Sequence, residues 1–184
     1  VSISGNHAIV GALNEDDDEN DMNTVLDAGS AYIFERDGLG NWTEQQKIVA
    51  SDRGTKHWFG TQVGITNNHA IVSSFGHRGN AGAAYVFKKD VSGNWTETQL
   101  IKSSDGVEND WFGNSMAISG NRIIAGATGQ AFDETGGNEL SSAGAAYIFE
   151  AMLTQAIGDE LEASNVQVFP NPASQIITIQ MAQN

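Results

Sequence analysis

The residues with the clearest capacity for chemistry are a run of acidic side chains near the N-terminus, Glu15-Asp-Asp-Asp-Glu-Asn-Asp21. Every residue of the run except Asn20 carries a carboxylate. Ca²⁺ binds about six to eight oxygen ligands in flexible sites, so an oxygen-rich loop of this kind suits that ion. The other interpretation is a solvated acidic loop that keeps the protein surface charged. The run therefore predicts either a calcium site or an exposed charged loop.

The histidines do not form a recognisable ligand set. None of the four has a partner at the spacing of a zinc site. They are His7, His57, His69 and His77. His7 and His69 stand beside asparagine-rich turns, and we expect both at the surface. We expect Asp52 and Asp105 to cap the turns that follow them by accepting hydrogen bonds from the backbone.

The sequence also lacks the common catalytic motifs. It has no cysteine, which excludes thiol nucleophiles, disulfides and thiolate zinc sites. It contains neither a Gly-x-Ser-x-Gly nucleophile elbow nor a phosphate-binding glycine loop. We therefore expect that this chain is not an enzyme.

The net charge of the chain excludes some classes of binding partner. Nine lysines and arginines face 23 aspartates and glutamates, so the formal net charge is -14. Nucleic acid and anionic membranes are therefore poor partners. No apolar run approaches the roughly 18 residues that cross a bilayer, so no membrane span is predicted. The first residue, Val1, already lies in a strand-like pattern, and we expect the sequence to begin partway through a longer protein.

The elements that position these residues are internal repeats. Residues 29–62 align without a gap to residues 82–115, at the constant offset that takes Trp42 to Trp95, and half of the aligned positions are identical. A third, incomplete copy repeats Gly82-Ala-Ala-Tyr at Gly144. The tryptophans and tyrosines recur at equivalent positions, and we expect them to pack inside the repeats. Repeats of this length are typical of stacked architectures.

Each repeat predicts four antiparallel strands. In the second copy these cover residues 61–66, 69–72, 82–87 and 95–101. The third strand is apolar on both faces, so both sides of its sheet must be covered. A four-stranded unit of about 50 residues with two covered faces is a β-propeller blade. We predict an all-β fold, a partial β-propeller of about three four-stranded antiparallel blades.

The predicted boundaries follow the repeats. The blades cover about residues 1–62, 63–115 and 116–149, the last one incomplete. A linker at 150–164 and a β-strand tail at 165–184 follow. The loops at residues 11–28, 73–81 and 126–143 differ in length between copies, and we expect such variable loops to share one face of the array.

The repeats resemble FG-GAP repeats, the blades of integrin-α-type propellers and of many bacterial surface proteins. The resemblance rests on Phe59-Gly60 and Phe112-Gly113, and on the Gly-Ala turns that end residues 8–12 and 123–127; Ser73-Ser74 departs from it. It covers residues 1–149. About seven blades are implied, so several blades are expected upstream of this sequence, which is too short to close a ring.

The resemblance also bears on the acidic run. Integrin-type blades carry a Ca²⁺ loop of the form Asp-x-Asp-x-Asp-Gly-x-x-Asp in this hairpin. Asp16, Asp18 and Asn20 reproduce its alternate spacing, whereas Asp21 takes the place of the glycine. A register that starts at Glu15 matches no better. The resemblance thus implies a possible Ca²⁺ ligand set at Asp16, Asp18, Asn20 and Asp21.

The third repeat lacks its outer strand. After Phe149 the expected Gly-Asn-Trp-Thr-Glu sequence is absent. One blade of a closed propeller is often completed by the other terminus of the ring. We therefore expect an upstream strand to fill this position.

The C-terminal tail carries a second resemblance. Val166-Gln-Val-Phe-Pro-Asn-Pro-Ala-Ser174 and the strand-like residues after it are similar to the opening of the type A sorting domain of the Bacteroidetes type IX secretion system. The motif positions are Phe169, Pro170, Asn171 and Pro172. An ordinary turn bounded by prolines is the alternative. The resemblance implies type IX secretion machinery as a partner and a truncated C-terminal secretion sorting domain at 165–184.

Together these observations indicate a non-catalytic interaction or adhesion module, secreted or attached to the outer cell surface. Its propeller loops would bind a protein or glycan ligand at the cell surface, with Ca²⁺ as a possible stabilising ion. The alternative is an accessory propeller of an extracellular enzyme whose catalytic residues lie outside this sequence.

Overall fold

The computed structural model describes residues 1–131 and 143–151, and the backbone of 166–168. The first sheet has four antiparallel strands that pair in chain order. They are β1 (Ser2–Ser4), β2 (His7–Ala12), β3 (Ser30–Arg36) and β4 (Trp42–Ile48). Asp37 accepts backbone N–H groups of Leu39 and Asn41, both at 2.8 Å, and so closes the turn between β3 and β4. Asp90 does the same in the next repeat. The repeated turn residues therefore set the repeated hairpin.

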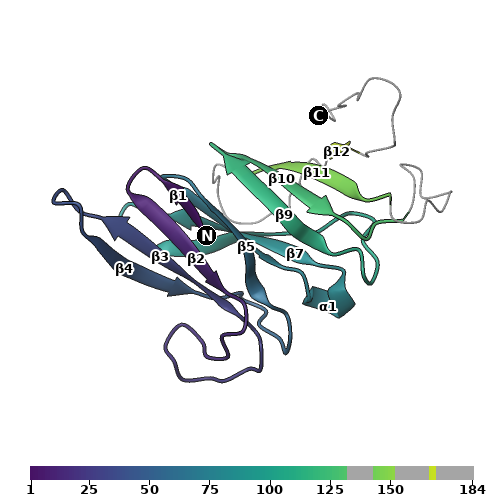
Figure 1. Cartoon of the computed structure of the whole chain (residues 1–184), viewed down its shortest axis with the longest axis horizontal. Helices are drawn as coiled ribbons and strands as arrows, with labels where there is room; N and C mark the ends of the chain where they lie inside the picture. Colours follow the sequence, from purple (N-terminus) through teal and green to yellow (C-terminus); the bar gives the residue numbers. More distant parts are fainter. Residues whose placement is uncertain (132–142, 152–165, 169–184) are drawn as a thin grey trace.

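The second and third sheets follow the same plan, and Figure 1 shows the three sheets side by side in chain order. The second contains β5 (Phe59–Ile65), β6 (His69–Ser74), β7 (Ala83–Lys89) and β8 (Trp95–Ile101), with the short turn α1 (His77–Asn80) between β6 and β7. The third contains β9 (Phe112–Ser119), β10 (Arg122–Ala127), β11 (Ala145–Glu150) and β12 (Val166–Val168). The predicted all-β fold of four-stranded antiparallel blades is confirmed. No helix in the described residues is long and apolar enough to cross a membrane.

The outer strand of the third sheet differs from the expectation. β12 pairs antiparallel with β11, with Ala146 opposite Val168 and Ile148 opposite Val166. The position that we expected an upstream strand to fill is thus taken by residues from the tail. The edge of an open sheet presents unpaired backbone N–H and C=O groups, so any strand of suitable register can pair with it.

The strands of the middle sheet are buried on both faces. Tyr85 and Phe87 of β7 pack with Ile9 and Ile33 of the first sheet, whereas Val86 packs into a second core beside the third sheet. Successive side chains of a strand point to opposite faces, so a central blade supplies two cores. Residues Ala83 to Phe87 are all buried. This confirms the prediction that the third strand is apolar on both sides because both sides are covered.

Adjacent sheets are in backbone contact where a glycine meets a phenylalanine. Gly29 forms an isolated parallel bridge with Phe59, and Gly82 forms one with Phe112. Both glycines have positive φ, 85° and 88°, a backbone conformation that side-chain-bearing residues rarely adopt. The glycine of the Gly-x-Ala-Tyr repeat is therefore required where one blade begins to pack on the next.

The sequence predicts that the tryptophans and tyrosines pack inside the repeats, but not all of them do. Tyr85, Tyr147 and Trp95 are buried, but Trp42 and Trp111 are 40% and 41% exposed. Trp42 and Trp95 are repeat equivalents, yet only Trp95 reaches a neighbouring sheet, where its ring meets that of His7 at a centroid distance of 5.9 Å. The burial of a repeated residue therefore depends on whether another blade lies beside it.

Candidate functional site

The candidate site is the end of the blades at which the long connections gather, which we call the loop end. Because consecutive strands are antiparallel, the connections β2–β3 (residues 13–29), β4–β5 (49–58), β6–β7 (75–82) and β8–β9 (102–111) all lie at one end of the sheets. The opposite end, which we call the turn end, carries the tight turns between β1 and β2, β3 and β4, β5 and β6, β7 and β8, and β9 and β10. The sequence predicts that the variable loops share one face, and the two that the structure describes throughout, at residues 11–28 and 73–81, lie at this end; most of the third, at 126–143, is outside the described residues.

The connections of the loop end are held by hydrogen bonds to one another. Arg53 donates to the carbonyl oxygens of Asn23 at 3.0 Å and Asp16 at 2.7 Å, which joins residues 49–58 to residues 13–29. The side chain of Asn80 donates to Asn109 at 3.1 Å, which joins the next two connections. The backbone N–H of Gly76 donates to the His57 carbonyl oxygen at 3.2 Å and joins the two pairs, so the four connections form one continuous surface.

Asp18 holds the shape of the β2–β3 connection, residues 13–29, which we call the acidic loop. Its Oδ1 accepts the backbone N–H groups of Asn20 and Met22, both at 2.9 Å, and its Oδ2 accepts a hydrogen bond from the Asn23 side chain. The side chain is only 6% exposed. These donors, the Met22 N–H foremost and the Asn23 amide next, lower the pKa of Asp18 to about 2. Asp18 therefore acts as an ionised acceptor that fixes the loop.

The charge of the acidic loop is partly neutralised by Lys47 of β4. The Lys47 ammonium lies 2.6 Å from Asp21 and 3.6 Å from Glu15. Glu15 also accepts a hydrogen bond from the Tyr32 hydroxyl at 3.0 Å. A backbone N–H from Asp17, together with these two neighbours and against partial burial, holds the pKa of Glu15 below its usual value. The loop is therefore tied to the sheet by a resident cation.

The residues predicted to bind Ca²⁺ share one loop but do not converge on one point. Asp16 accepts the backbone N–H of Asp27 at 2.6 Å, Asp18 is surrounded by its own donors, and Asp21 pairs with Lys47, while Asn20 donates to Glu19. Within the described residues, the one group of three metal-binding side chains with ligand atoms within 4.8 Å lies elsewhere. In this arrangement the donor set does not fit a calcium ion, and calcium binding by the loop stays a prediction from the sequence pattern.

The lowered pKa of Asp18 predicts a stability difference that depends on pH. A carboxyl whose pKa is lower in the folded state stabilises the fold above its unfolded pKa, near 3.8, and this contribution is lost as the pH falls through the folded value of about 2. Asp18→Asn should therefore be less stable than the unchanged chain at pH 7, and the gap should shrink between pH 5 and pH 2. Urea unfolding of both proteins across that range measures it. A gap that stays constant with pH would contradict the assigned role.

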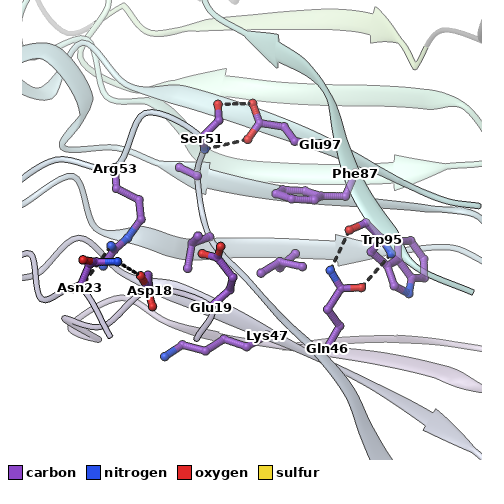
Figure 2. A pocket seen from close by; sticks show the side chains of 13 residues that line it. Asp18, Glu19, Asn23, Gln46, Lys47, Ser51, Arg53, Phe87, Trp95 and Glu97 are labelled. Atoms are coloured by element: carbon purple, nitrogen blue, oxygen red, sulfur yellow. Dashed lines mark hydrogen bonds between the residues drawn. The ribbon is translucent and has the colours of Figure 1, made fainter. Parts of the chain in front are cut away.

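A groove of about 470 Å³ separates the acidic loop from the second sheet (Figure 2). Asp18, Glu19 and Arg53 line one side, and Phe87 and Trp95 line the other. It lies across the junction of the first two sheets, between strand β4 and strand β8. A groove with a polar wall and an apolar wall can accept an extended chain or a sugar.

The floor of the groove is bridged by hydrogen bonds between the two sheets. The Gln46 side chain donates to the Trp95 carbonyl and accepts the Trp95 N–H, both at 2.8 Å. Ser51 donates twice to the Glu97 carboxylate, from its backbone N–H at 2.9 Å and its hydroxyl at 2.8 Å. Figure 2 shows both pairs, the first between β4 and β8 and the second between the β4–β5 connection and β8. These bonds fix the groove walls relative to each other.

Asp52 and Asp105 do not cap their turns, which corrects the expectation from the sequence. Asp52 accepts the hydroxyl of Tyr85 at 2.6 Å, and Asp105 accepts that of Tyr147 at 2.9 Å. Each aspartate follows the outer strand of one sheet and reaches a buried tyrosine in the next. A buried hydroxyl requires a partner, and this partner comes from the neighbouring blade. The recurring aspartates therefore join blades.

His57 and His77 come together beside Asp52, which also corrects the expectation that the histidines form no set. The Nε2 atom of His77 lies 3.0 Å from Asp52 Oδ2, and the two imidazole rings lie 5.0 Å apart in an edge-to-face arrangement. His57 comes from the β4–β5 connection and His77 from α1. We call Asp52, His57 and His77 the histidine cluster. The constant repeat offset could have found it, because that offset takes its members to Asp105, Asp110 and Gln130, which are all polar.

Burial controls the protonation of the histidine cluster. It lowers the pKa of His57 and of His77 below the usual value, against the attraction of Asp52. Partial burial would raise the pKa of Asp52, but hydrogen bonds from Tyr85 and His77 outweigh it and keep that pKa low. Burial and the Asp52 carboxylate raise the pKa of Tyr85. At neutral pH the cluster therefore holds two neutral imidazoles and one carboxylate.

We expected His7 and His69 at the surface, but both are buried. They are 8% and 7% exposed, whereas the equivalent Arg122 is exposed. His7 contacts Lys89 of the second sheet, with 2.9 Å between His7 Nε2 and the Lys89 ammonium. Burial, and then the Lys89 charge, lower the pKa of His7. The position begins the second strand of each blade, where an adjacent blade can cover it.

The predicted secretion motif, Phe169, Pro170, Asn171 and Pro172, lies outside the described residues. The linker predicted at 150–164 is described only at Glu150 and Ala151.

One family model matches the chain. The model is described as the FG-GAP repeat, and it matches residues 42–87 and 95–149, more than half of the sequence. Each matched segment runs from the outer strand of one sheet to the third strand of the next, β4 to β7 and β8 to β11. Each therefore contains one aspartate–tyrosine pair that joins two blades. No curated protein matches the chain.

Proposed function

Because the chain belongs to the FG-GAP repeat family, we propose that it is a non-catalytic interaction module that binds a protein or glycan ligand through its loop end. The observation that carries this proposal is the gathering of the long connections at one end of the blades, where hydrogen bonds join them into one surface. Loops positioned on a rigid scaffold are the usual place for binding residues. A surface that is ordered before binding also loses less entropy when a ligand arrives.

The composition of the loop end supports a protein or glycan partner. Met22 and Leu26 of the acidic loop are 77% and 54% exposed, and Trp111 is 41% exposed. Exposed apolar and aromatic side chains surrounded by polar groups are typical of binding surfaces. The adjacent carboxylates favour a ligand with basic or hydroxyl groups and disfavour an anionic one.

The polar groups of the loop end support a non-catalytic role. Asp18 is held by donors of its own connection, Asp52 by the Tyr85 hydroxyl of the next sheet, and Glu97 of β8 by Ser51 of the β4–β5 connection. These carboxylates therefore hold the shape of the surface through their hydrogen bonds. We place the module outside the cell, secreted or on the outer cell surface, as is typical of FG-GAP repeats. The tail motif at 169–172 would address it to the type IX secretion machinery.

The proposal predicts that ligand binding depends on the loop end. The full chain, labelled with biotin, is applied to a glycan array and to a panel of immobilised extracellular proteins. The double variant Met22→Ser and Leu26→Ser should weaken binding about tenfold or more, because it removes exposed apolar contacts. The matched control, Leu39→Ser and Val91→Ser, changes two exposed apolar residues at the turn end and should bind normally.

Two outcomes would contradict the proposal. One is binding that falls equally in both double variants, which would place the contact away from the loop end. The other is binding that neither variant alters. Circular dichroism and thermal unfolding of each variant confirm that the fold is kept, since all four residues are solvent-exposed.

A further inference from the structure

We infer that the histidine cluster, Asp52, His57 and His77, binds a divalent transition-metal ion of the Zn²⁺ class. The three side chains each offer a ligand atom, and these atoms lie within 4.8 Å of one another. They come from two connections of the loop end, so the site exists only in the folded protein. It is separate from the acidic loop for which the sequence predicts calcium.

The donor set suits zinc in number and kind. Two imidazole nitrogens and one carboxylate oxygen are the ligands of many zinc sites that keep a fourth position open. Ligand atoms about 2.0–2.1 Å from a tetrahedral ion lie about 3.3 Å from each other. The Nε2 atom of His77 and Oδ2 of Asp52 are 3.0 Å apart, close to that value. These two atoms now share a hydrogen bond, so a metal ion between them would replace its proton, and the three ligand atoms, within 4.8 Å of one another, would move toward tetrahedral spacing.

The imidazoles retain hydrogen-bonding capacity that the protein does not use. Among the described residues, the buried Nδ1 atoms of His57 and His77 have no hydrogen-bond partner. His77 is only 2% exposed. Buried polar atoms nearly always have a partner. His7 and His69 also each have one buried ring nitrogen without a partner in the described part of the chain, but in the cluster two such rings lie beside the Asp52 carboxylate with their centroids 5.0 Å apart. Nitrogen donors select ions such as Zn²⁺ or Cu²⁺ over Ca²⁺ and Mg²⁺.

The surrounding chain holds the three groups in place. The Asp52 carboxylate is fixed by the Tyr85 hydroxyl at 2.6 Å, which leaves its second oxygen toward His77. The His57 ring lies over Gly54, where an added Cβ would stand 2.5 Å from the ring atoms. The Asp52 side chain is 42% exposed, so an ion can arrive from solvent. Support of this kind around a ligand is what orients metal sites.

The next blade shows that the histidines are not needed for blade packing. There Gln130 donates to Asp105 at 3.1 Å in the place of His77, and Asp110 stands in the place of His57. The aspartate–tyrosine contact is the same in both blades. The two imidazoles are therefore an addition to one blade junction, which indicates a role beyond folding.

The test is a titration of the full chain with ZnCl₂, followed by calorimetry and by thermal unfolding. We expect one site per chain and a rise in Tm. His77→Gln copies the next blade and keeps the hydrogen bond to Asp52, so it should fold but bind Zn²⁺ at least tenfold more weakly. The matched control, His69→Gln, changes a buried histidine outside the cluster and should bind as the unchanged chain does.

Three results would overturn the inference: no heat and no rise in Tm with Zn²⁺ for the unchanged chain, equal affinity in His77→Gln, or equal loss in His69→Gln. Co²⁺ gives a second measurement on the unchanged chain, because visible absorption bands of a tetrahedral nitrogen and oxygen site should appear and then vanish on adding Zn²⁺. A parallel titration with CaCl₂ should leave the cluster empty, so that Zn²⁺ added afterwards binds with unchanged affinity. A fall in Zn²⁺ affinity would count against a nitrogen-selective site.

Discussion

Replacing Phe59 by alanine should lower the free energy of unfolding by about 3–5 kcal/mol. Phe59 is fully buried at the start of β5. Its ring meets those of Tyr85 and Phe87 edge to face, with centroids 5.3 Å and 6.1 Å away. The substitution removes the ring from the core between the first two sheets and leaves a cavity whose walls lose their contacts. A loss of this size is a large share of the stability of an ordinary domain.

Guanidinium unfolding at 25 °C measures the loss as a lower transition midpoint. Leu39→Ala is the control, since Leu39 is 90% exposed in a tight turn and should change stability by less than about 0.5 kcal/mol. Phe112→Ala should repeat the large effect, because Phe112 meets Tyr147 and Phe149 in the same way in the next core. Loss of less than about 1 kcal/mol from Phe59→Ala would show that the two sheets do not share a packed core.

Gly82→Ala should destabilise the chain by about 2–6 kcal/mol, because backbone strain and overpacking act together. Gly82 has a φ of 88°, and a Cβ placed on it would lie 2.2 Å from the carbonyl oxygen of Phe112. That oxygen belongs to the backbone of the next blade, so it cannot move without shifting β9. The equivalent Gly29 would place its Cβ 2.0 Å from Phe59 O.

Gly38→Ala is the matched control for the glycine prediction. A Cβ at Gly38 meets no atom within 4 Å, so alanine there should be neutral or should stabilise by about 0.5 kcal/mol. Thermal unfolding of the two variants beside the unchanged chain provides the comparison. Equal midpoints for Gly82→Ala and Gly38→Ala would mean that the blades are not in backbone contact at this bridge.

The two blade junctions share a scaffold and differ in chemistry. The aspartate–tyrosine pair and the glycine–phenylalanine bridge occur at both. The residues around the aspartate differ, with histidines at one junction and Asp110 with Gln130 at the other. Burial, and then the charge of Asp105, raise the pKa of Asp110, against a hydrogen bond from Val107. A repeat architecture can therefore change a junction's chemistry without changing its fold.

The sequence by itself determined the blades. The repeat offset, the alternation of apolar residues and the turn residues Asp37 and Asp90 act within a few residues of chain, so they predict β5 to β8 and their equivalents closely. The apolar residues on both sides of the third strand also predicted that both faces of a blade are covered. The FG-GAP resemblance stated from Phe59-Gly60 and Phe112-Gly113 agrees with the family match.

Only the tertiary structure decided which side chains meet across the blades. It brought His57 and His77 to Asp52, buried His7 against the next sheet, and placed β12 beside β11. These contacts join residues far apart in the chain, and their distances depend on how neighbouring sheets stack and on the path of each connection. Sequence spacing reports on local backbone geometry, so it specifies strands and turns, whereas a cluster assembled from separate connections is fixed only when the blades pack together.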